Sequence, residues 1–307
     1  MKRTLAEGWT LRVAAAMGLS LVGCVALWGL DPRVLDNGDS VWLKPIRFSL
    51  AFGVHLLTMA WLAHLGRGER EPLHRAFAAG LWLQIVAAIV EWICIAMQAA
   101  RGVHSHFNYA TLFDHAVFMV MGWGTAVLLA GMILCSWGVA RSQAEPLVKR
   151  LLQGALALAI LGALAGVLMV MPTTEQRALL EQGQRLAWIG GTTVGTPSGQ
   201  SLPFFHWDLS SGDWRAVHFI GLHALQAMAL LAWFGRRAKP TRSVDRWVMV
   251  GAWAYAVLFA VAAVWTALAH SILATAVPGW WGLAAPGLLF ALSAAVILGS
   301  EVRRRVD

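Results

Sequence analysis

Charged side chains are scarce in this sequence: they make up 13% of the 307 residues, whereas an ordinary soluble domain has about a quarter. Hydrophobic residues make up 58%, and the mean hydropathy is +0.62. This composition excludes a disordered chain. The sequence contains no heptad repeat, so it does not predict a coiled coil. Only three cysteines are present, without a CxxC pair, which excludes a disulfide-rich secreted scaffold. The sequence therefore predicts an integral membrane protein.

Eight apolar runs are long enough to cross about 30 Å of hydrocarbon at about 1.5 Å per residue. Turn or charge signals bound each run. We expect an all-α fold, a polytopic bundle of about eight transmembrane helices that forms a single transmembrane domain over 1–307. The predicted spans are Thr10–Leu30, Pro45–Leu65, Ala76–Ala100, Leu112–Trp137, Leu151–Met171, Arg215–Phe234, Trp247–His270 and Trp280–Gly299.

The distribution of basic residues predicts the orientation of these spans. With a cytoplasmic N-terminus, 17 of the 24 basic residues fall on the inner side, among them Lys2, Arg3, Arg70 and Lys239. The inverted orientation would break the positive-inside rule in almost every loop. We therefore expect both termini to be cytoplasmic. This topology accounts for most of the formal net charge of +8, so the charge is no argument for nucleic-acid binding.

Two features concern the organisation of the chain. The string Trp42-Leu-Lys-Pro-Ile-Arg-Phe48 is weakly similar to Trp214-Arg-Ala-Val-His-Phe219, which allows a four-plus-four repeat of 1–140 and 141–307. The third outer loop, 172–214, exceeds forty residues, a length that is usually functional or disordered. Its glycine-rich stretch 190–199 predicts irregular chain, and its aromatic residues favour docking. Whether this loop is a lid or a docking surface stays open.

Ionisable residues gather in the predicted outer half of the bundle. At about 1.5 Å per residue, His115 and His218 lie about 6 Å below the outer boundary, and Glu91 and His223 about 12 to 14 Å below it. His55 lies near the midplane. Ionisable groups at such depth are costly and indicate a functional site.

Each of these residues also has a structural interpretation. Glu91 can be a neutral acid bonded to a backbone carbonyl or to Gln98. Asp114 can cap the helix that it starts, and His104-Ser-His106 can be an ordinary loop pair. His218 and His223 are five residues apart, so they do not share a helix face as an i, i+4 chelate does.

Four cations on the outer side run against the orientation signal: Lys44, Arg47, Arg101 and Arg215. Neighbouring aspartates can neutralise them. Alternatively, they bind the carboxylate or phosphate of an anionic small molecule or lipid headgroup at the outer face.

Three strings resemble those of a group of bacterial multi-spanning inner-membrane proteins: Trp42-Leu-Lys-Pro-Ile-Arg-Phe48, Arg101-Gly-Val-His-Ser-His-Phe-Asn108 and the segment from Gly212 to Gln226. The resemblance covers the second to sixth spans and the long outer loop. It implies a bacterial source and an inner-membrane location, and it assigns no activity. No P-loop, GxGxxG, HExxH or GxSxG motif is present to assign one.

Four functions remain open, and with them the question whether the protein is an enzyme. The first is binding of haem b or a redox metal, with His115 and His218, or His55 and His223, as axial ligands and the four outer cations as propionate partners. The second is a metal-dependent hydrolase or transferase acting on a lipid-borne anionic substrate. Its metal ligands would come from His115, His218, His223 and Glu91, with Asp114 as base or orienting group.

The third possibility is a proton-coupled transporter with Glu91 and His223 as a proton relay. The fourth is a membrane assembly or binding protein whose long outer loop binds another protein. Whichever of these functions applies, we expect a functional site in the outer half of the bundle, and we expect the lipid bilayer to be a partner of the protein.

Overall fold

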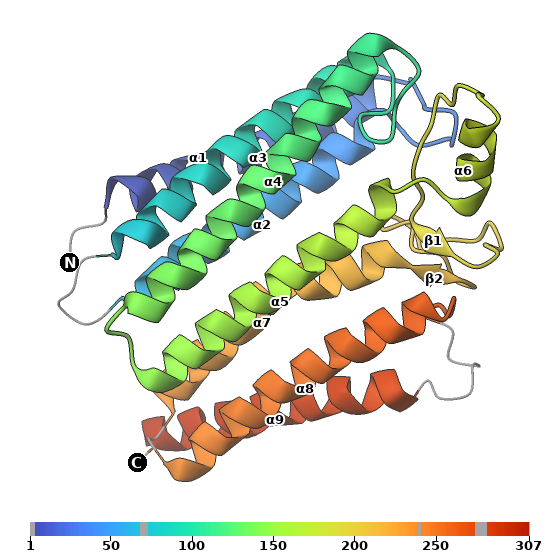
Figure 1. Cartoon of the computed structure of the whole chain (residues 1–307). Coiled ribbons are helices and arrows are strands. Elements are labelled where there is room, and N and C mark those ends of the chain that lie inside the picture. Colours follow the sequence, from blue (N-terminus) through green and yellow to red (C-terminus); the bar gives the residue numbers. More distant parts are fainter. Residues whose placement is uncertain (1–3, 68–72, 239–240, 274–280, 307) are drawn as a thin grey trace. The chain divides into compact units, whose positions relative to one another are not determined.

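The computed structural model describes residues 4–67, 73–238, 241–273 and 281–306. Within these ranges nine helices and one two-stranded sheet follow one another (Figure 1). They are α1 (Leu5–Leu30), α2 (Leu43–Leu65), α3 (Arg75–Arg101), α4 (Leu112–Arg141), α5 (Pro146–Val170), α6 (Thr174–Glu181), β1 (Thr193–Val194), β2 (Gly212–Asp213), α7 (Trp214–Arg237), α8 (Arg242–Ala267) and α9 (Trp281–Val306).

Eight of the helices in these ranges, all but α6, are long and apolar enough to cross a membrane. The chain is therefore a multi-pass helical membrane protein, and the helices match the predicted spans to within a few residues. The first helix begins earlier than expected because Thr4 and Glu7 form a capping box at its start. Lys2, Arg3, Arg70 and Lys239, which entered the orientation prediction, and Trp280, the predicted start of the last span, lie outside the described residues.

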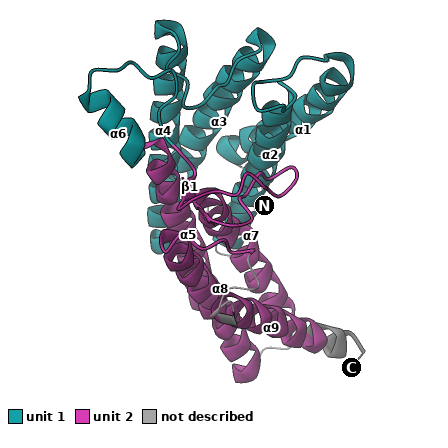
Figure 2. Ribbon diagram, turned by 90° about the vertical axis from the view of Figure 1, so that its right-hand side faces the viewer, with its two compact units in different colours: residues 1–143, 172–190 teal, residues 144–171, 191–307 magenta. Residues whose placement is uncertain are grey.

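The chain divides into two compact units, coloured separately in Figure 2. Unit 1 comprises residues 1–143 and 172–190, and unit 2 comprises residues 144–171 and 191–307. The long loop between α5 and α7 is shared between them. The structure adds helix α6 and the short β1–β2 pairing to this loop, neither of which the sequence indicated.

Unit 1 contains α1 to α4, which pair most closely as α1 with α2 and α3 with α4. Glycine makes the second pairing possible: a Cβ at Gly80 would lie 2.4 Å from the Gly131 carbonyl oxygen, and one at Gly138 would lie 2.6 Å from the Cβ of Phe77. Any larger residue at these positions would push the two helices apart. Thus α3, which carries Glu91, is held tightly against α4.

Unit 2 contains α5, α7, α8 and α9, which pair most closely as α5 with α7 and α8 with α9. At the first pairing the backbones approach at Gly162 and Gly221, where a Cβ added to Gly221 would lie 2.4 Å from the Gly162 Cα. The Tyr255 hydroxyl of α8 donates to the Ile220 carbonyl of α7 at 2.7 Å. These contacts fix the face of α7 that carries His218.

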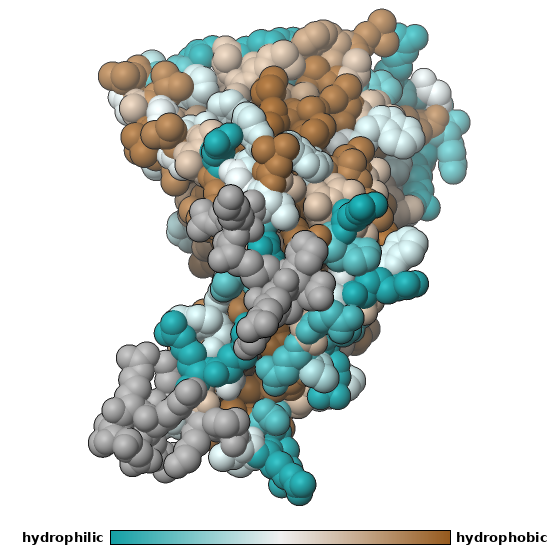
Figure 3. Space-filling view, turned by 90° about the vertical axis from the view of Figure 1, so that its left-hand side faces the viewer, coloured by the Kyte–Doolittle hydropathy of each residue, from teal (hydrophilic) through white to brown (hydrophobic). Residues whose placement is uncertain are grey.

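The surface has the character expected of a membrane protein. Leu19 and Leu112 are 76% and 90% exposed, which is unfavourable in water and favourable against lipid. Figure 3 views the end at which α1 and α3 begin, where hydrophilic side chains lie among hydrophobic ones. Arg75 and Arg141 are exposed basic residues at helix termini of unit 1, as is typical of the flanks of membrane-spanning helices.

Candidate functional site

Two cations of the candidate site lie on the first turns of α2. Pro45 is tolerated there because the first residues of a helix need no backbone partner for their N–H groups. Lys44 and Arg47 are three residues apart, so they share a face of the helix. Both are partly buried, and the charges of Arg47 and of Glu91 on α3 act on Lys44. The two helices thus bring positive and negative groups together inside unit 1.

Glu91 is a carboxylic acid inside the span α3, with only 7% of its surface exposed. Its Oε1 lies 3.1 Å from the Nε2 of His106. Its Oε2 has no hydrogen-bond partner in the part of the chain that the structure describes, and it faces Gly124 of α4, where a Cβ would lie 3.4 Å away. A buried carboxylate oxygen without a hydrogen bond is costly, which marks this position as more than a packing residue.

His106 belongs to the loop between α3 and α4 and points back toward α3. Its ring is surrounded by the rings of Phe48, Phe107 and Phe118, whose centroids lie 5.6, 6.2 and 6.0 Å away. Burial lowers the pKa of His106 well below its usual value, and the charge of Lys44 lowers this pKa further. His106 is therefore neutral at neutral pH.

The ring of His106 lies between a hydroxyl group and a buried carboxylate. The Ser105 hydroxyl lies 3.1 Å from its Nδ1, and Glu91 lies 3.1 Å from its Nε2. If Ser105 donates to Nδ1, the ring hydrogen is on Nε2, the ring nitrogen nearest to the Glu91 carboxylate. The imidazole therefore links a loop hydroxyl to a buried acid, which is an arrangement able to hold or pass on a proton.

The loop that carries His106 is held by a second segment of unit 1. Phe107 has a left-handed φ of 61°, which a bulky residue rarely adopts. Its carbonyl accepts from the Ile189 N–H at 3.2 Å, and the Tyr109 N–H donates to the Ala187 carbonyl at 2.8 Å. Contacts to residues 187–189 therefore determine the backbone on which His106 stands.

A second polar cluster of unit 1 contains two more predicted site residues. Asp114 is buried and accepts hydrogen bonds from Gln98, Thr111 and Arg101, the last at 2.5 Å. Its carboxylate therefore binds the ends of α3 and α4 together, as in the structural interpretation of the sequence. His115, the next residue, is partly exposed and lies against Tyr109, with 4.5 Å between the ring centroids.

His55 lies apart from these groups, on α2 of unit 1. Its Nε2 lies 2.7 Å from the Gln84 Oε1 of α3, and the Gln84 amide in turn donates to the Gly80 carbonyl and lies 3.3 Å from the Cys135 sulfur. The carbonyl oxygen and the amide nitrogen of Gln84 are both occupied by these contacts. His55 and Gln84 therefore join α2, α3 and α4.

The remaining predicted residues belong to unit 2. Arg215 is paired with Asp213 through its Nε and a terminal nitrogen at 2.5 to 3.1 Å, so an aspartate neutralises this cation. His218 contacts the Gly162 carbonyl of α5 through Nδ1 at 2.8 Å. The His223 side chain is hydrogen-bonded to that of Gln226. The centroids of the His223 and Phe219 rings are 4.0 Å apart.

The structure thus brings His106 within 3.1 Å of the predicted residue Glu91, and it places the predicted residue Lys44 where its charge acts on Glu91. Nothing in the sequence distinguishes His106 from His104 in the same loop. A usable signal was the shortness of the α3–α4 loop, which keeps its side chains near the helix ends. The proposed axial pairs divide between the units, with His55 and His115 in unit 1 and His218 and His223 in unit 2.

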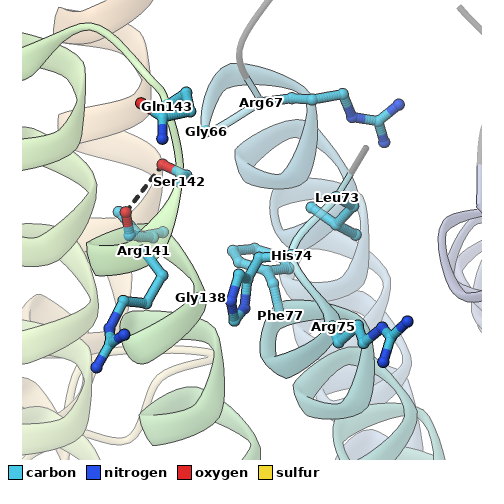
Figure 4. Close-up of a pocket in the computed structure, with 11 residues that line it drawn as sticks. Gly66, Arg67, Leu73, His74, Arg75, Phe77, Gly138, Arg141, Ser142 and Gln143 are labelled. Carbon is cyan, nitrogen blue, oxygen red and sulfur yellow. Dashed lines mark hydrogen bonds between the residues drawn. The ribbon is translucent and has the colours of Figure 1, made fainter. Parts of the chain in front are cut away.

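A cavity of about 370 Å³ lies at the other end of unit 1, between Gly66, Leu73 and His74 on one side and Gly138 and Gln143 on the other. Figure 4 shows the His74 ring at its centre, while the guanidinium groups of the lining arginines point away from it. The Ser142 hydroxyl donates to the Val139 carbonyl at 2.8 Å. The polar groups of this cavity do not converge as those around Glu91 do.

No group of three or more His, Cys, Asp or Glu residues arranged to hold a metal ion occurs within residues 4–67, 73–238, 241–273 and 281–306. In comparisons with known proteins, no protein-family model, no curated protein and no solved structure matches the chain. The functional argument therefore depends on the geometry of the two units.

Proposed function

We propose that this protein is a proton-coupled transporter of a small anion in the bacterial inner membrane. The 3.1 Å approach of the buried Glu91 carboxylate to the His106 ring, where the charge of Lys44 acts on both, carries the proposal. A carboxylic acid and an imidazole in contact inside a membrane-spanning unit are the groups from which proton relays are made. If both termini are cytoplasmic, as the basic residues predict, the end of unit 1 that carries His106 is on the periplasmic side.

The charges around Glu91 provide a mechanism for coupling. Lys44 stabilises the ionised form of Glu91 as long as no other anion is near. An anion bound by Lys44 and Arg47 would offset this positive charge and add a negative one, so that proton uptake by Glu91 or His106 becomes favourable. By linkage, protonation would strengthen anion binding by the same factor. Binding of an anion and a proton are therefore coupled without any further group.

Proton flux in proteoliposomes tests the proposal. Vesicles that contain a pH-sensitive dye and a clamped membrane potential would be given an inward gradient of phosphate, chloride, succinate or citrate. We expect the interior to acidify with one of these anions, and Glu91→Gln to abolish the acidification. Glu175→Gln is the matched control, because Glu175 is exposed on α6 of the same unit. If none of the four anions acidifies the vesicles beyond protein-free ones, the proposal is wrong.

Infrared difference spectroscopy of the purified protein tests whether anion binding protonates Glu91, separately from transport. We expect addition of the transported anion to produce a carboxylic-acid C=O band that is absent in Glu91→Gln and present in Glu175→Gln. An unchanged band in Glu91→Gln would assign the proton to another group.

A second candidate function, binding of haem b or a redox metal, is supported by His218. Because its Nδ1 donates to the Gly162 carbonyl, its Nε2 presents a lone pair, as in most metal-ligating histidines. The ring also lies against Gly166, where a Cβ would lie only 3.2 Å from Nδ1. A bound haem or redox metal would supply electron transfer. These residues fit a single histidine ligand in unit 2.

Absorption spectra of oxidised and dithionite-reduced protein test this candidate. Protein from haem-replete cells should show a Soret band that shifts on reduction and is lost in His218→Ala but not in His270→Ala. A flat spectrum, together with metal analysis that finds no redox metal, would eliminate it.

A further inference from the structure

The outer segment of unit 2 contains a hairpin with an unusual concentration of exposed aromatic residues. Residues 200–209 turn back on themselves: the Leu202 N–H donates to the Trp207 carbonyl at 2.8 Å, and the Leu209 N–H donates to the Gln200 carbonyl at 3.1 Å. Phe204 and Phe205 at its tip are 39% and 40% exposed. Large exposed aromatic groups that are adjacent in space mark an interaction surface.

Backbone geometry and hydrogen bonds hold this hairpin in one conformation, although its tip is exposed. Phe204 and His206 have left-handed φ angles of 65° and 59°, which non-glycine residues rarely adopt. At its base, the buried Asp208 carboxylate accepts from the backbone N–H groups of Ser210 and Ser211 at 2.8 and 2.7 Å. Such a backbone persists only where its surroundings fix it. The hairpin therefore presents its rings in one arrangement.

Ring contacts place the hairpin beside the first turns of the membrane-spanning helix α7. Phe205 and Trp207 pack edge-on against Phe219 of α7, with 5.6 and 5.3 Å between centroids. Phe219 is five residues into this span, about 7.5 Å along the helix from its start at Trp214. A loop that reaches this depth beside a membrane-spanning helix is no longer surrounded by bulk water.

We propose that the 200–209 hairpin is a membrane anchor whose aromatic tip inserts into the lipid leaflet around the first turns of α7. Phe and Trp favour the headgroup region, where an apolar ring and its polar surroundings are both accommodated. The partner is the lipid surface itself. This inference uses only unit 2 and is independent of the transport proposal.

Spin labelling in liposomes of phosphatidylethanolamine and phosphatidylglycerol tests this inference. A nitroxide at Phe204→Cys should be more accessible to oxygen, which partitions into lipid, than to a water-soluble nickel chelate. A label at the matched control, Ser198→Cys, lies on exposed polar chain of the same segment and should show the reverse. Wild-type protein gives the background, since Cys24, Cys94 and Cys135 are buried.

The possible outcomes separate the lipid from other occupants. If the label at position 204 is accessible mainly to the nickel chelate, the tip is in water and the proposal is overturned. If it is shielded from both reagents, protein covers the tip, and the proposal is equally overturned. Phe205→Cys repeats the measurement in case Phe204→Cys unfolds, as judged by thermal unfolding.

Discussion

The two units use similar polar residues in different ways. In unit 1, Lys44 lies beside a buried carboxylate, Glu91, that also contacts an imidazole. In unit 2, the cation at the start of α7, Arg215, is paired with Asp213 two residues before it, and His218 is hydrogen-bonded to a backbone carbonyl. Residue type and depth therefore do not identify a site by themselves. What distinguishes unit 1 is that Lys44 and Glu91, whose charges act on each other, come from different helices.

The units also differ in where their helices approach most closely. Glycines allow the closest approach at α3–α4 in unit 1 and at α5–α7 in unit 2. If 1–140 and 141–307 are repeats, as the sequence allows, the close contact is in the last helix pair of the first repeat, α3–α4, and in the first helix pair of the second repeat, α5–α7. The candidate site of each unit includes one helix of its glycine-rich pair.

The largest effect is expected from filling these close contacts. Gly221→Val in unit 2 and Gly138→Val in unit 1 would each place a side chain within 3 Å of backbone atoms, so we expect each to lower the free energy of unfolding by about 3 kcal/mol. Gly154→Val, on α5 with no atom within 4 Å, should change it by less than about 0.5 kcal/mol. Thermal unfolding in detergent measures all three. Equal stability of Gly221→Val and Gly154→Val would show that the close approach is dispensable.

Removing one cation from each unit tests the electrostatic contrast. Lys44→Met leaves the Glu91 carboxylate buried without its neighbouring ammonium group, and we expect a loss of about 2 kcal/mol, less than for a fully buried pair because Lys44 is partly exposed. Arg215→Met breaks a pair whose arginine side chain is 32% exposed and should cost about 1 kcal/mol or less. Equilibrium unfolding in mixed micelles compares them. A larger loss for Arg215→Met would reverse the contrast.

Acid should affect the two units in different pH ranges. The pKa of His106 in unit 1 is lower in the folded state than in the unfolded state, where it is 6.5. The contribution of His106 to the free energy of unfolding is therefore complete above pH 6.5. As the pH falls below 6.5, this contribution is lost by up to about 1.4 kcal/mol per pH unit. In unit 2, burial raises the pKa of Asp208, but hydrogen bonds from Ser210 and Ser211 lower it below 3.8 overall. Its contribution is therefore lost only at a pH below 3.8.

The melting temperature between pH 7.5 and 5.5 measures the contribution of His106. We expect it to fall in the wild type and to fall less in His106→Gln, which has no imidazole to protonate. A parallel decrease in both proteins would assign the acid sensitivity to another group.

The smallest effect concerns two helix caps. Thr111 caps α4 in unit 1 and also donates to Asp114 at 2.6 Å, whereas Thr241 only caps α8 in unit 2. We expect Thr241→Ala to cost about 1 kcal/mol and Thr111→Ala about twice as much, because the buried carboxylate loses a donor. Unfolding of the two variants under identical conditions compares them, and equal losses would show that the Asp114 contact adds nothing.

The sequence was sufficient for the spans because length and apolar composition determine which segments can cross a membrane. For Arg101 and Arg215, the sequence predicted only that neighbouring aspartates could neutralise them. It could not place His106 beside Glu91, because the backbone of Phe107 depends on hydrogen bonds to residues 187–189, which are eighty residues further along the chain. Contacts of this kind carry no local periodicity.

The same contact has a consequence for synthesis of the protein in the cell. Unit 1 is completed by residues 172–190, so α5 must leave the ribosome before the segment that holds the His106 loop does. The first four spans can therefore enter the membrane while the loop between α3 and α4 still lacks its hydrogen-bond partners. A nascent chain that ends after α4 would contain Glu91 and His106, but the backbone that joins them would not yet be fixed.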